Sequence, residues 1–189
     1  MTDAPAPRGL EQRAPARRLF FAVWPDEPAR LSLAEATKRH VNAGQGRAQR
    51  ADQWHLTVEF LGDVPEARLP DVLDAGAAAS ALACAFDVAF DRIEYWKRPQ
   101  VLCLSASSIP GPLASLVQSL RSELARHGFV PEARPYKAHV TLARKVRQAS
   151  PAELVDPLRW LVGELALVES VTDRSGSRYE SLATWPLRG

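Results

Sequence analysis

QWHLTVEFLG, residues 53–62, has the alternating pattern of a β-strand with one apolar and one polar face. Side chains alternate along a strand, so residues i and i+2 share a face. The apolar face is expected to carry Trp54, Leu56, Val58 and Phe60. The opposite face then carries His55, Thr57 and Glu59, and these polar residues in a strand that otherwise looks buried require an explanation.

A second segment, PYKAHVTLARK at residues 135–145, repeats this arrangement. His139 and Thr141 share one face of the expected strand, and Val140 and Leu142 share the other. In both strands a histidine is followed two residues later by a threonine on the same face. This pair of His-x-Thr strands is the feature of the sequence that bears most directly on function.

Hydrophobic patterning and turn residues predict the other elements. Strands are expected over residues 19–24, 54–62, 86–96, 100–106, 139–145, 163–171 and 178–185. Helices are expected from Asp26 to about His40, along the apolar stripe of residues 69–77, and from Pro112 to Gly128. The pattern assigns no element to residues 146–162.

The order of these elements predicts the fold class. Each half of the chain contains a helix followed by a His-x-Thr strand, which is a weak internal repeat. We therefore expect an α+β fold with two similar lobes, each with an antiparallel sheet and helices, and a cleft between them that receives one motif from each lobe. Residues 18–189 are expected to form this single bilobal domain, and residues 1–17, rich in Pro and Arg, a disordered tail.

The composition is ordinary for a globular protein, with a formal net charge of +2. No apolar run approaches the roughly 18 residues needed to span a bilayer, and the first residues lack the apolar core of a secretory signal. The two cysteines, Cys84 and Cys103, have no CxxC spacing and are expected to be buried and reduced. These features favour a cytoplasmic protein without a membrane partner, and we expect a monomer.

The basic residues are unevenly distributed along the chain. Four lie between Glu35 and Asp52 without an acid among them, and five lie from Arg134 to Ala152, again without an acid. The second run encloses His139. Such runs are either solvated surface or a binding surface for an anion, and the charge pattern alone leaves both open.

Several kinds of chemistry are disfavoured by the sequence. No HExxH motif, HxH motif or cysteine cluster suggests a metal site, and no GxSxG elbow suggests a serine nucleophile. Two histidines without a metal suit displacement at phosphorus, where one imidazole accepts a proton from water and the other donates one to the leaving oxygen. Thr57, Thr141 and Arg144 could then bind the phosphate oxygens, which gain charge in the transition state.

HLTV at residues 55–58 and HVTL at residues 139–142 resemble the paired HxTx motifs of the 2H phosphoesterase superfamily, and in particular the bacterial LigT-like RNA 2′,3′-cyclic phosphodiesterases. The resemblance extends from about Arg18 to Leu187. It implies a bilobal fold, no cofactor or metal, and hydrolysis of 2′,3′-cyclic phosphate ends of RNA or nucleotides to 2′-phosphomonoesters. By matching position it implies that His55 is the proton donor and His139 the proton acceptor.

Four more residues are candidate substrate contacts. Trp96, Lys97 and Arg98 form an aromatic and basic turn between two expected strands, which is either a nucleotide contact or an exposed hairpin. Tyr136 could pack beneath the ligand or close the strand. Two other functions remain open: an ATP-independent 2′-5′ RNA ligase, and a catalytically idle module that binds RNA or nucleotides.

Overall fold

A computed structural model describes residues 15–173 and 176–189 of the 189-residue chain. The strands are β1 (Ala16–Val23), β2 (Arg47–Ala48), β3 (Leu56–Pro65), β4 (Phe86–Trp96), β5 (Val101–Ser105), β6 (His139–Arg144), β7 (Ala152–Val162), β8 (Glu164–Asp173) and β9 (Gly176–Pro186). The α-helices are α1 (Glu27–Ala43), α2 (Leu69–Leu82) and α3 (Gly111–Arg126), and two short 3₁₀ helices are η1 (Ala51–Gln53) and η2 (Glu66–Arg68).

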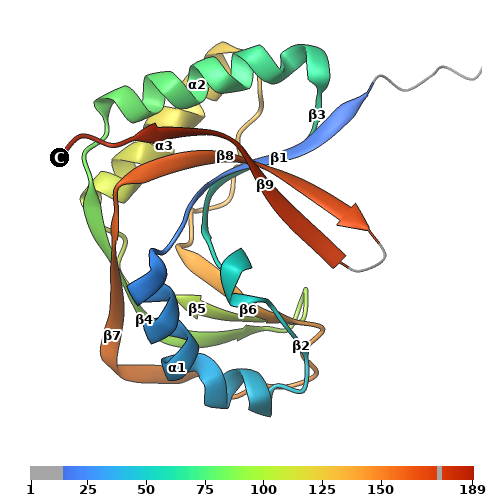
Figure 1. Cartoon of the computed structure of the whole chain (residues 1–189), viewed down its shortest axis with the longest axis vertical. Coiled ribbons are helices and arrows are strands. Elements are labelled where there is room, and N and C mark those ends of the chain that lie inside the picture. The colour runs from blue at the N-terminus through green and yellow to red at the C-terminus, as the bar shows by residue number, and fades with distance from the viewer. Residues whose placement is uncertain (1–14, 174–175) are drawn as a thin grey trace, which may run out of the picture.

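The main strands follow the order β7-β4-β5-β6-β3-β1-β8-β9, and β2 pairs with β6. They divide into two lobes (Figure 1). The upper lobe contains β3, β1, β8 and β9, covered by α2 and α3. The lower lobe contains β7, β4, β5 and β6, with α1 packed against β6 and β7. The expected α+β architecture with a His-x-Thr strand in each lobe is confirmed.

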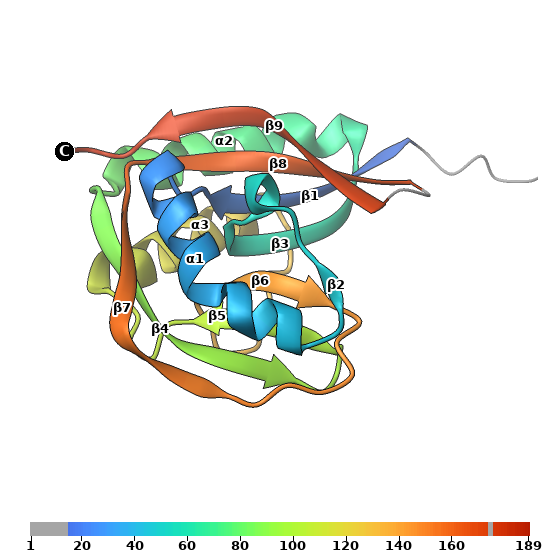
Figure 2. The same cartoon turned by 60° about the horizontal axis from the view of Figure 1, so that its bottom comes forward.

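The two lobes meet at one backbone pair. β3 and β6 are antiparallel neighbours, and the single residue pair between them joins Leu56 to Val140. The other neighbours in the main strand order pair over several residues, as β1 and β3 do. Beyond this one pair β3 and β6 diverge, so each continues into its own lobe (Figure 2).

The chain passes back and forth between the lobes. It leaves the upper lobe after β1 to form α1 and β2, returns for β3 and α2, and crosses again for β4 and β5. α3 then contacts β3 of the upper lobe before the chain forms β6 and β7 below, and β8 and β9 complete the upper lobe. Each lobe is therefore built from segments that alternate with those of the other lobe along the sequence.

The predicted elements are confirmed in type and order. Asp26 caps α1 by accepting a hydrogen bond from the backbone N–H of Ala29 at 2.9 Å, although α1 continues past His40 to Ala43. The predicted tail over residues 1–17 falls mostly outside the described residues, but β1 already begins at Ala16. Of the two cysteines, both free thiols, Cys103 is buried as expected and Cys84 is exposed.

The sequence prediction misses β7. This strand pairs with β4 alone and lies at one edge of the sheet. Pro157 disrupts its alternating pattern, and the pairing with β4 is irregular between Phe90 and Arg92, opposite the part of β7 that contains Pro157. An edge strand tolerates proline where no backbone N–H is needed for pairing. Pro157 therefore makes β7 hard to recognise in the sequence but does not prevent the strand from forming.

Each His-x-Thr strand contains a β-bulge directly after its threonine. In β3 the register with β1 skips Val58, and in β6 the register with β5 skips Leu142. An extra residue reverses the alternation of faces beyond it. The prediction that Phe60 shares the apolar face and Glu59 the His55 face is therefore wrong: Phe60 is 47% exposed, and Glu59 is buried at 2%.

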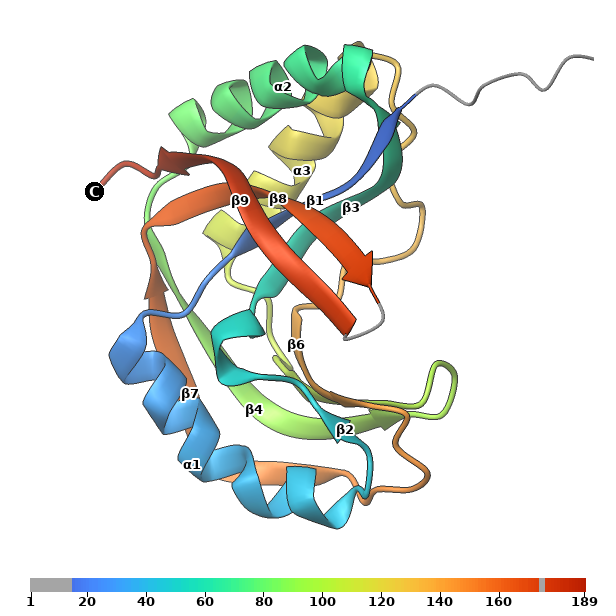
Figure 3. The same cartoon turned by 45° about the vertical axis from the view of Figure 1, so that its right-hand side comes forward.

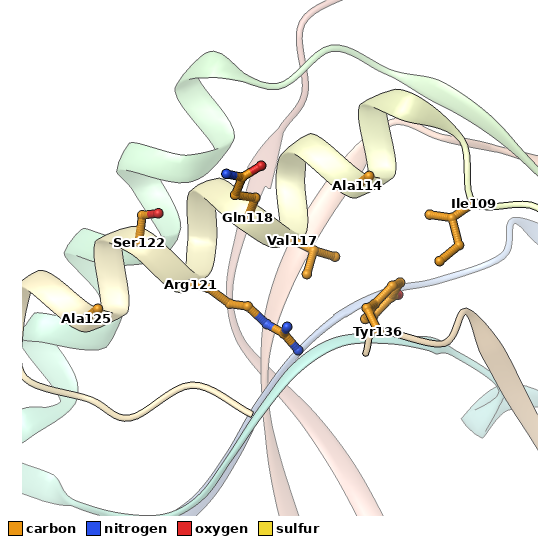
Figure 4. A pocket seen from close by; sticks show the side chains of 8 residues that line it. All are labelled: Ile109, Ala114, Val117, Gln118, Arg121, Ser122, Ala125 and Tyr136. Atoms are coloured by element: carbon orange, nitrogen blue, oxygen red, sulfur yellow. The ribbon is translucent and has the colours of Figure 1, made fainter. Parts of the chain in front are cut away.

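Side chains supplement the single backbone pair between the lobes. The carboxylate of Glu59 on β3 accepts hydrogen bonds from Arg121 of α3 at 2.6 Å and from the backbone N–H of Glu132 at 2.9 Å. The hydroxyl of Tyr136 donates to the backbone oxygen of Thr57 at 2.9 Å. Figure 4 shows Arg121 and Tyr136 beside each other under α3, where they line a pocket of about 460 Å³. These contacts attach the segment before β6 to β3.

Tyr136→Phe should loosen this attachment, because it removes the hydroxyl that bonds to Thr57 and leaves the ring in place. We expect the free energy of unfolding to fall by about 1–2 kcal/mol, measured by urea denaturation, and the imidazole NMR signals of His55 and His139 to shift. Tyr95→Phe is the matched control, because its hydroxyl donates to the backbone oxygens of Val146 and Arg147 and not, among the described residues, to β3. Equal shifts in the two variants would contradict the bridging role.

Candidate active site

The two motif histidines lie next to the backbone pair that joins the lobes. His55 directly precedes Leu56, and His139 directly precedes Val140. In an antiparallel pair, one step to either side sets His55 across from Thr141 and Thr57 across from His139. The fold therefore brings both motifs together at the boundary between the lobes.

Both imidazole rings are held in the same way. Nδ1 of His55 lies 2.8 Å from the backbone oxygen of Gln53, and Nδ1 of His139 lies 2.8 Å from the backbone oxygen of Lys137. A carbonyl oxygen can only accept, so each Nδ1 carries a proton and donates it. In each neutral ring Nε2 is then the nitrogen that can accept or deliver a proton.

Aromatic side chains surround His55. Its ring centroid lies 5.0 Å from that of Phe20, 5.1 Å from that of Trp24 and 5.0 Å from that of Tyr179, with Tyr179 edge-on to the imidazole. His139 has a single aromatic neighbour among the described residues, Trp96, at 4.6 Å. The rings restrict the orientation of each imidazole and reduce its contact with water.

The site lowers the pKa of both histidines. Burial is the main cause at His55, and the charges of Arg144 and His139 add to it, which lowers the pKa of His55 to about 4. The pKa of His139 is also lowered, again mainly by burial, with contributions from the charges of Lys137 and Arg144. Because the charge of His139 lowers the pKa of His55, the two rings titrate as a coupled pair.

A pocket of about 540 Å³ opens beside His55. It is lined by two cations, three aromatic rings and four other polar side chains: Arg18, Arg144, Phe20, Phe60, Tyr179, His55, Thr57, Ser170 and Ser177. Arg144 lines this pocket because of the bulge after Thr141. The extra residue in the strand turns the side chain of Arg144 toward the cleft. Phe60 reaches the pocket for the same reason after Thr57.

A second pocket, of about 550 Å³, opens beside His139 and shares Thr57 and Phe60 with the first. Trp96 lies against His139 here, and Glu94 accepts hydrogen bonds from Nε1 of Trp96 and from Nζ of Lys137, both at 2.7 Å. Burial would raise the pKa of Glu94, but these hydrogen bonds outweigh it and lower that pKa. The two pockets form one cleft with a histidine on each side.

Not every predicted site residue lines this cleft. His55, His139, Thr57, Arg144, Trp96 and Tyr136 do so. Thr141 lines neither pocket, and it pairs with Cys103 of β5. Lys97 and Arg98 lie in the exposed turn between β4 and β5 and also line neither pocket.

Arg18, Phe60 and Tyr179 are among the residues of the site that were not predicted from the sequence. Arg18 lies over the ring of Phe60, with its guanidinium carbon 4.8 Å from the ring centroid. Tyr179 comes from β9 and contacts Phe20 edge-on at 5.3 Å. No local pattern could have identified Tyr179, because β9 reaches the cleft only through its pairing with β8.

The basic run around His139 is partly neutralised. Arg134 pairs with Glu132 at 2.5 Å, and Lys137 pairs with Glu94 at 2.7 Å. Both acids come from outside this run of the sequence. Arg144, by contrast, forms no ion pair within residues 15–173 and 176–189.

The same described residues contain no group of three or more His, Cys, Asp or Glu side chains that could hold a metal ion. Within them, no helix is long and apolar enough to cross a membrane.

Comparison with known families gives two matches that together cover most of the chain. The family described as LigT-like phosphoesterase matches residues 23–103 and again residues 104–179, so each match contains one His-x-Thr strand. This chain belongs to the LigT-like phosphoesterase family. The double match also confirms the internal repeat that the sequence suggested.

Curated relatives share this family. The RNA 2′,3′-cyclic phosphodiesterase of Escherichia coli is 32% identical over 176 residues, which cover 90% of this chain and 97% of the relative. The RNA 2′,3′-cyclic phosphodiesterase of Thermus thermophilus is 32% identical over 186 residues, which cover 91% of each chain.

Solved structures agree with the fold. A crystal structure of a phosphoesterase superposes with a TM-score of 0.83 at 29% identity and covers 93% of this chain and all of that one. E. coli LigT complexed with 3′-AMP superposes with a TM-score of 0.81 at 29% identity and covers 92% of this chain and 99% of that one.

Arg144 should influence the protonation of both histidines. We expect Arg144→Gln to raise the pKa of His55 and of His139, because it removes a nearby positive charge that disfavours the imidazolium. NMR titration of the imidazole nitrogens measures this change. Arg159→Gln, an exposed position on β7, is the matched control. Unchanged pKa values in Arg144→Gln would contradict the placement of this cation.

Proposed function

We propose that this protein hydrolyses 2′,3′-cyclic phosphate ends of RNA to 2′-phosphomonoesters by metal-independent acid–base catalysis. The observation that carries the proposal is the matched pair of imidazoles on the two sides of one cleft, each with Nδ1 bonded to a backbone oxygen and Nε2 available. In-line displacement at phosphorus needs a base on one side and an acid on the other.

In the proposed reaction, Nε2 of His139 accepts a proton from water as the water oxygen attacks phosphorus. The bond from phosphorus to the ribose O3′ breaks, and Nε2 of protonated His55 donates its proton to O3′. The product keeps the phosphate on O2′, and exchange of one proton with solvent restores both rings. The donor and acceptor assignment follows the resemblance to the family; the nearly symmetric hydrogen bonds would allow either order.

Thr57 and Arg144, which line the cleft, are proposed phosphate ligands, and Thr141 is added to them from the resemblance of its motif, although it lines neither pocket. The threonine hydroxyls would donate to the non-bridging oxygens, and Arg144 supplies a charge without an ion-pair partner among the described residues. The nucleoside would lie in the pocket beside His55, where Phe20, Phe60 and Tyr179 offer aromatic surfaces for a base. Trp96 and Tyr136 are proposed contacts on the His139 side.

The lowered pKa values fit this scheme once substrate is present. In the empty site both rings are neutral near pH 7, because burial and Arg144 disfavour their charged forms. The cyclic phosphate brings a negative charge between them, which favours the imidazolium. Binding of substrate thus promotes protonation of the ring that must act as the acid.

An ATP-independent 2′-5′ RNA ligase is the second candidate. The pocket beside His139 is about as large as the one beside His55, so it has room for more than a water molecule. If the 5′-hydroxyl of a second RNA strand took the place of the attacking water, the same displacement at phosphorus would again break the bond to O3′ and would give a 2′-5′ phosphodiester instead of a 2′-phosphomonoester. A catalytically idle module is disfavoured because both motifs retain their histidine and threonine.

Hydrolysis should survive treatment with a chelator. We expect nucleoside 2′,3′-cyclic phosphates incubated with EDTA-treated protein to be converted to nucleoside 2′-phosphates, with the product position assigned by phosphorus NMR. Turnover that stops in EDTA and recovers with a divalent metal would contradict a metal-independent mechanism. A 3′-phosphate product would contradict the assigned bond cleavage.

The pH profile should be bell-shaped and should depend on the bound state. Because both histidine pKa values are lowered in the free protein, kcat/KM should peak below about pH 6.5. The kcat profile should peak at higher pH, because the bound phosphate raises both histidine pKa values.

His55→Ala and His139→Ala should each reduce kcat by about 10²–10⁴-fold with unchanged circular dichroism. A flat profile, or a variant with full activity, would exclude the paired mechanism.

A further inference from the structure

Two basic segments lie side by side at the end of the lower lobe. One is the turn between β4 and β5, residues 97–100, and the other begins at the end of β6, residues 144–147. Val101 pairs with Arg144, and the backbone N–H of Val146 donates to the oxygen of Gln100 at 3.0 Å. Figure 3 shows this turn projecting at the end of the lower lobe, near the chain that leaves β6.

These two segments bring together five exposed cations, which we call the cationic ridge: Lys97, Arg98, Arg144, Lys145 and Arg147. Neither segment contains an acidic residue. In the part of the chain that the structure describes, none of the five forms an ion pair. The ridge is therefore a local concentration of positive charge on a protein whose net charge is only +2.

The backbone of the ridge is held in place. The hydroxyl of Tyr95 donates to the backbone oxygens of Val146 at 2.9 Å and Arg147 at 3.0 Å. Lys145 and Gln100 have positive φ angles of 57° and 64°, which side-chain-bearing residues rarely adopt without support from their surroundings. A fixed backbone presents its cations in a defined arrangement rather than as mobile surface charges.

The ridge is continuous with the cleft, because Arg144 belongs to both. The other wall of the cleft differs in charge. Beside His139, the cations Arg121, Arg134 and Lys137 are each paired with an acid: Glu59, Glu132 and Glu94 respectively. Unpaired positive charge thus leads out of the cleft in one direction, over the tip of the lower lobe.

We propose that the cationic ridge binds the phosphodiester backbone of the RNA strand that leads to the cyclic phosphate. This inference rests on the proposed function, since it extends the same site from a terminal nucleotide to a polymer. A single strand presents a row of phosphates, and cations that neutralise them release bound counterions. Lys97 and Arg98, which the sequence analysis named as candidate substrate contacts and which line neither pocket, would then bind phosphates of the RNA strand outside the cleft.

The test compares two double variants of the ridge, Lys97→Ala/Arg98→Ala and Lys145→Ala/Arg147→Ala, with Arg126→Ala/Arg159→Ala. All three remove two positive charges, but Arg126 and Arg159 are exposed positions on α3 and β7 that line none of the described pockets. Fluorescence anisotropy with a short RNA that ends in a 3′-phosphate measures binding without turnover. The effect of this binding on catalysis is measured by the ratio of kcat/KM for an oligonucleotide that ends in a 2′,3′-cyclic phosphate to kcat/KM for a nucleoside 2′,3′-cyclic phosphate.

We expect each ridge variant to weaken RNA binding at least fivefold and to lower that ratio by a similar factor. The slope of log affinity against log salt concentration should become shallower by about 0.7 for each RNA phosphate that the variant no longer neutralises. The control pair should change neither the slope nor the ratio. Ridge variants that match the control would overturn the proposal.

Two outcomes separate this proposal from the proposed function. If the ridge variants lose RNA affinity while no variant and no wild-type protein hydrolyses cyclic phosphates, the surface stands as an RNA site and the proposed activity fails. If they lose affinity for phosphatidylserine vesicles and keep affinity for RNA, the ridge is a membrane surface and the RNA proposal is wrong.

Discussion

The backbone pair between Leu56 and Val140 is the constraint on which the site depends. Had β3 and β6 paired along their length, the His and Thr side chains would lie on the flat face of one continuous sheet. Because the strands share one pair and then diverge, a cleft opens directly beside it, and the histidines that precede the two paired residues lie at its two sides. The residues that join the lobes are therefore also the ones that position the two histidines.

The bulges after Thr57 and Thr141 also shape the cleft that opens beside this backbone pair. Regular alternation would have turned Phe60 and Arg144 away from the cleft, and the extra residues Val58 and Leu142 turn them toward it. In β3 the same reversal buries Glu59 under α3, where its carboxylate pairs with Arg121 and accepts a hydrogen bond from the backbone N–H of Glu132, which holds the segment that leads to His139. One local irregularity thus both builds the cleft and attaches the two strands.

Sequence patterns predict only those features of the fold that local periodicity determines. It predicts both His-x-Thr faces correctly, because alternation holds up to each threonine, and it fails at the next residues, because no residue type marks an inserted position in a strand. It misses β7 because Pro157 is permitted only by an edge position that the sequence does not reveal. Tyr179 is beyond such reasoning, since its place beside His55 depends on the order of distant strands.

Charge counted along the chain is also a poor guide to charge in space. The acid-free run around His139 is met by Glu94 and Glu132 from neighbouring segments, whereas Arg144 forms no ion pair within the described residues. Positive charge therefore accumulates at Arg144 rather than at His139. In the empty site this charge opposes protonation of both imidazoles, and it also attracts the phosphate that would reverse that effect. The cation that keeps the resting histidines neutral is thus suited to recruit the anion that lets one of them act as an acid.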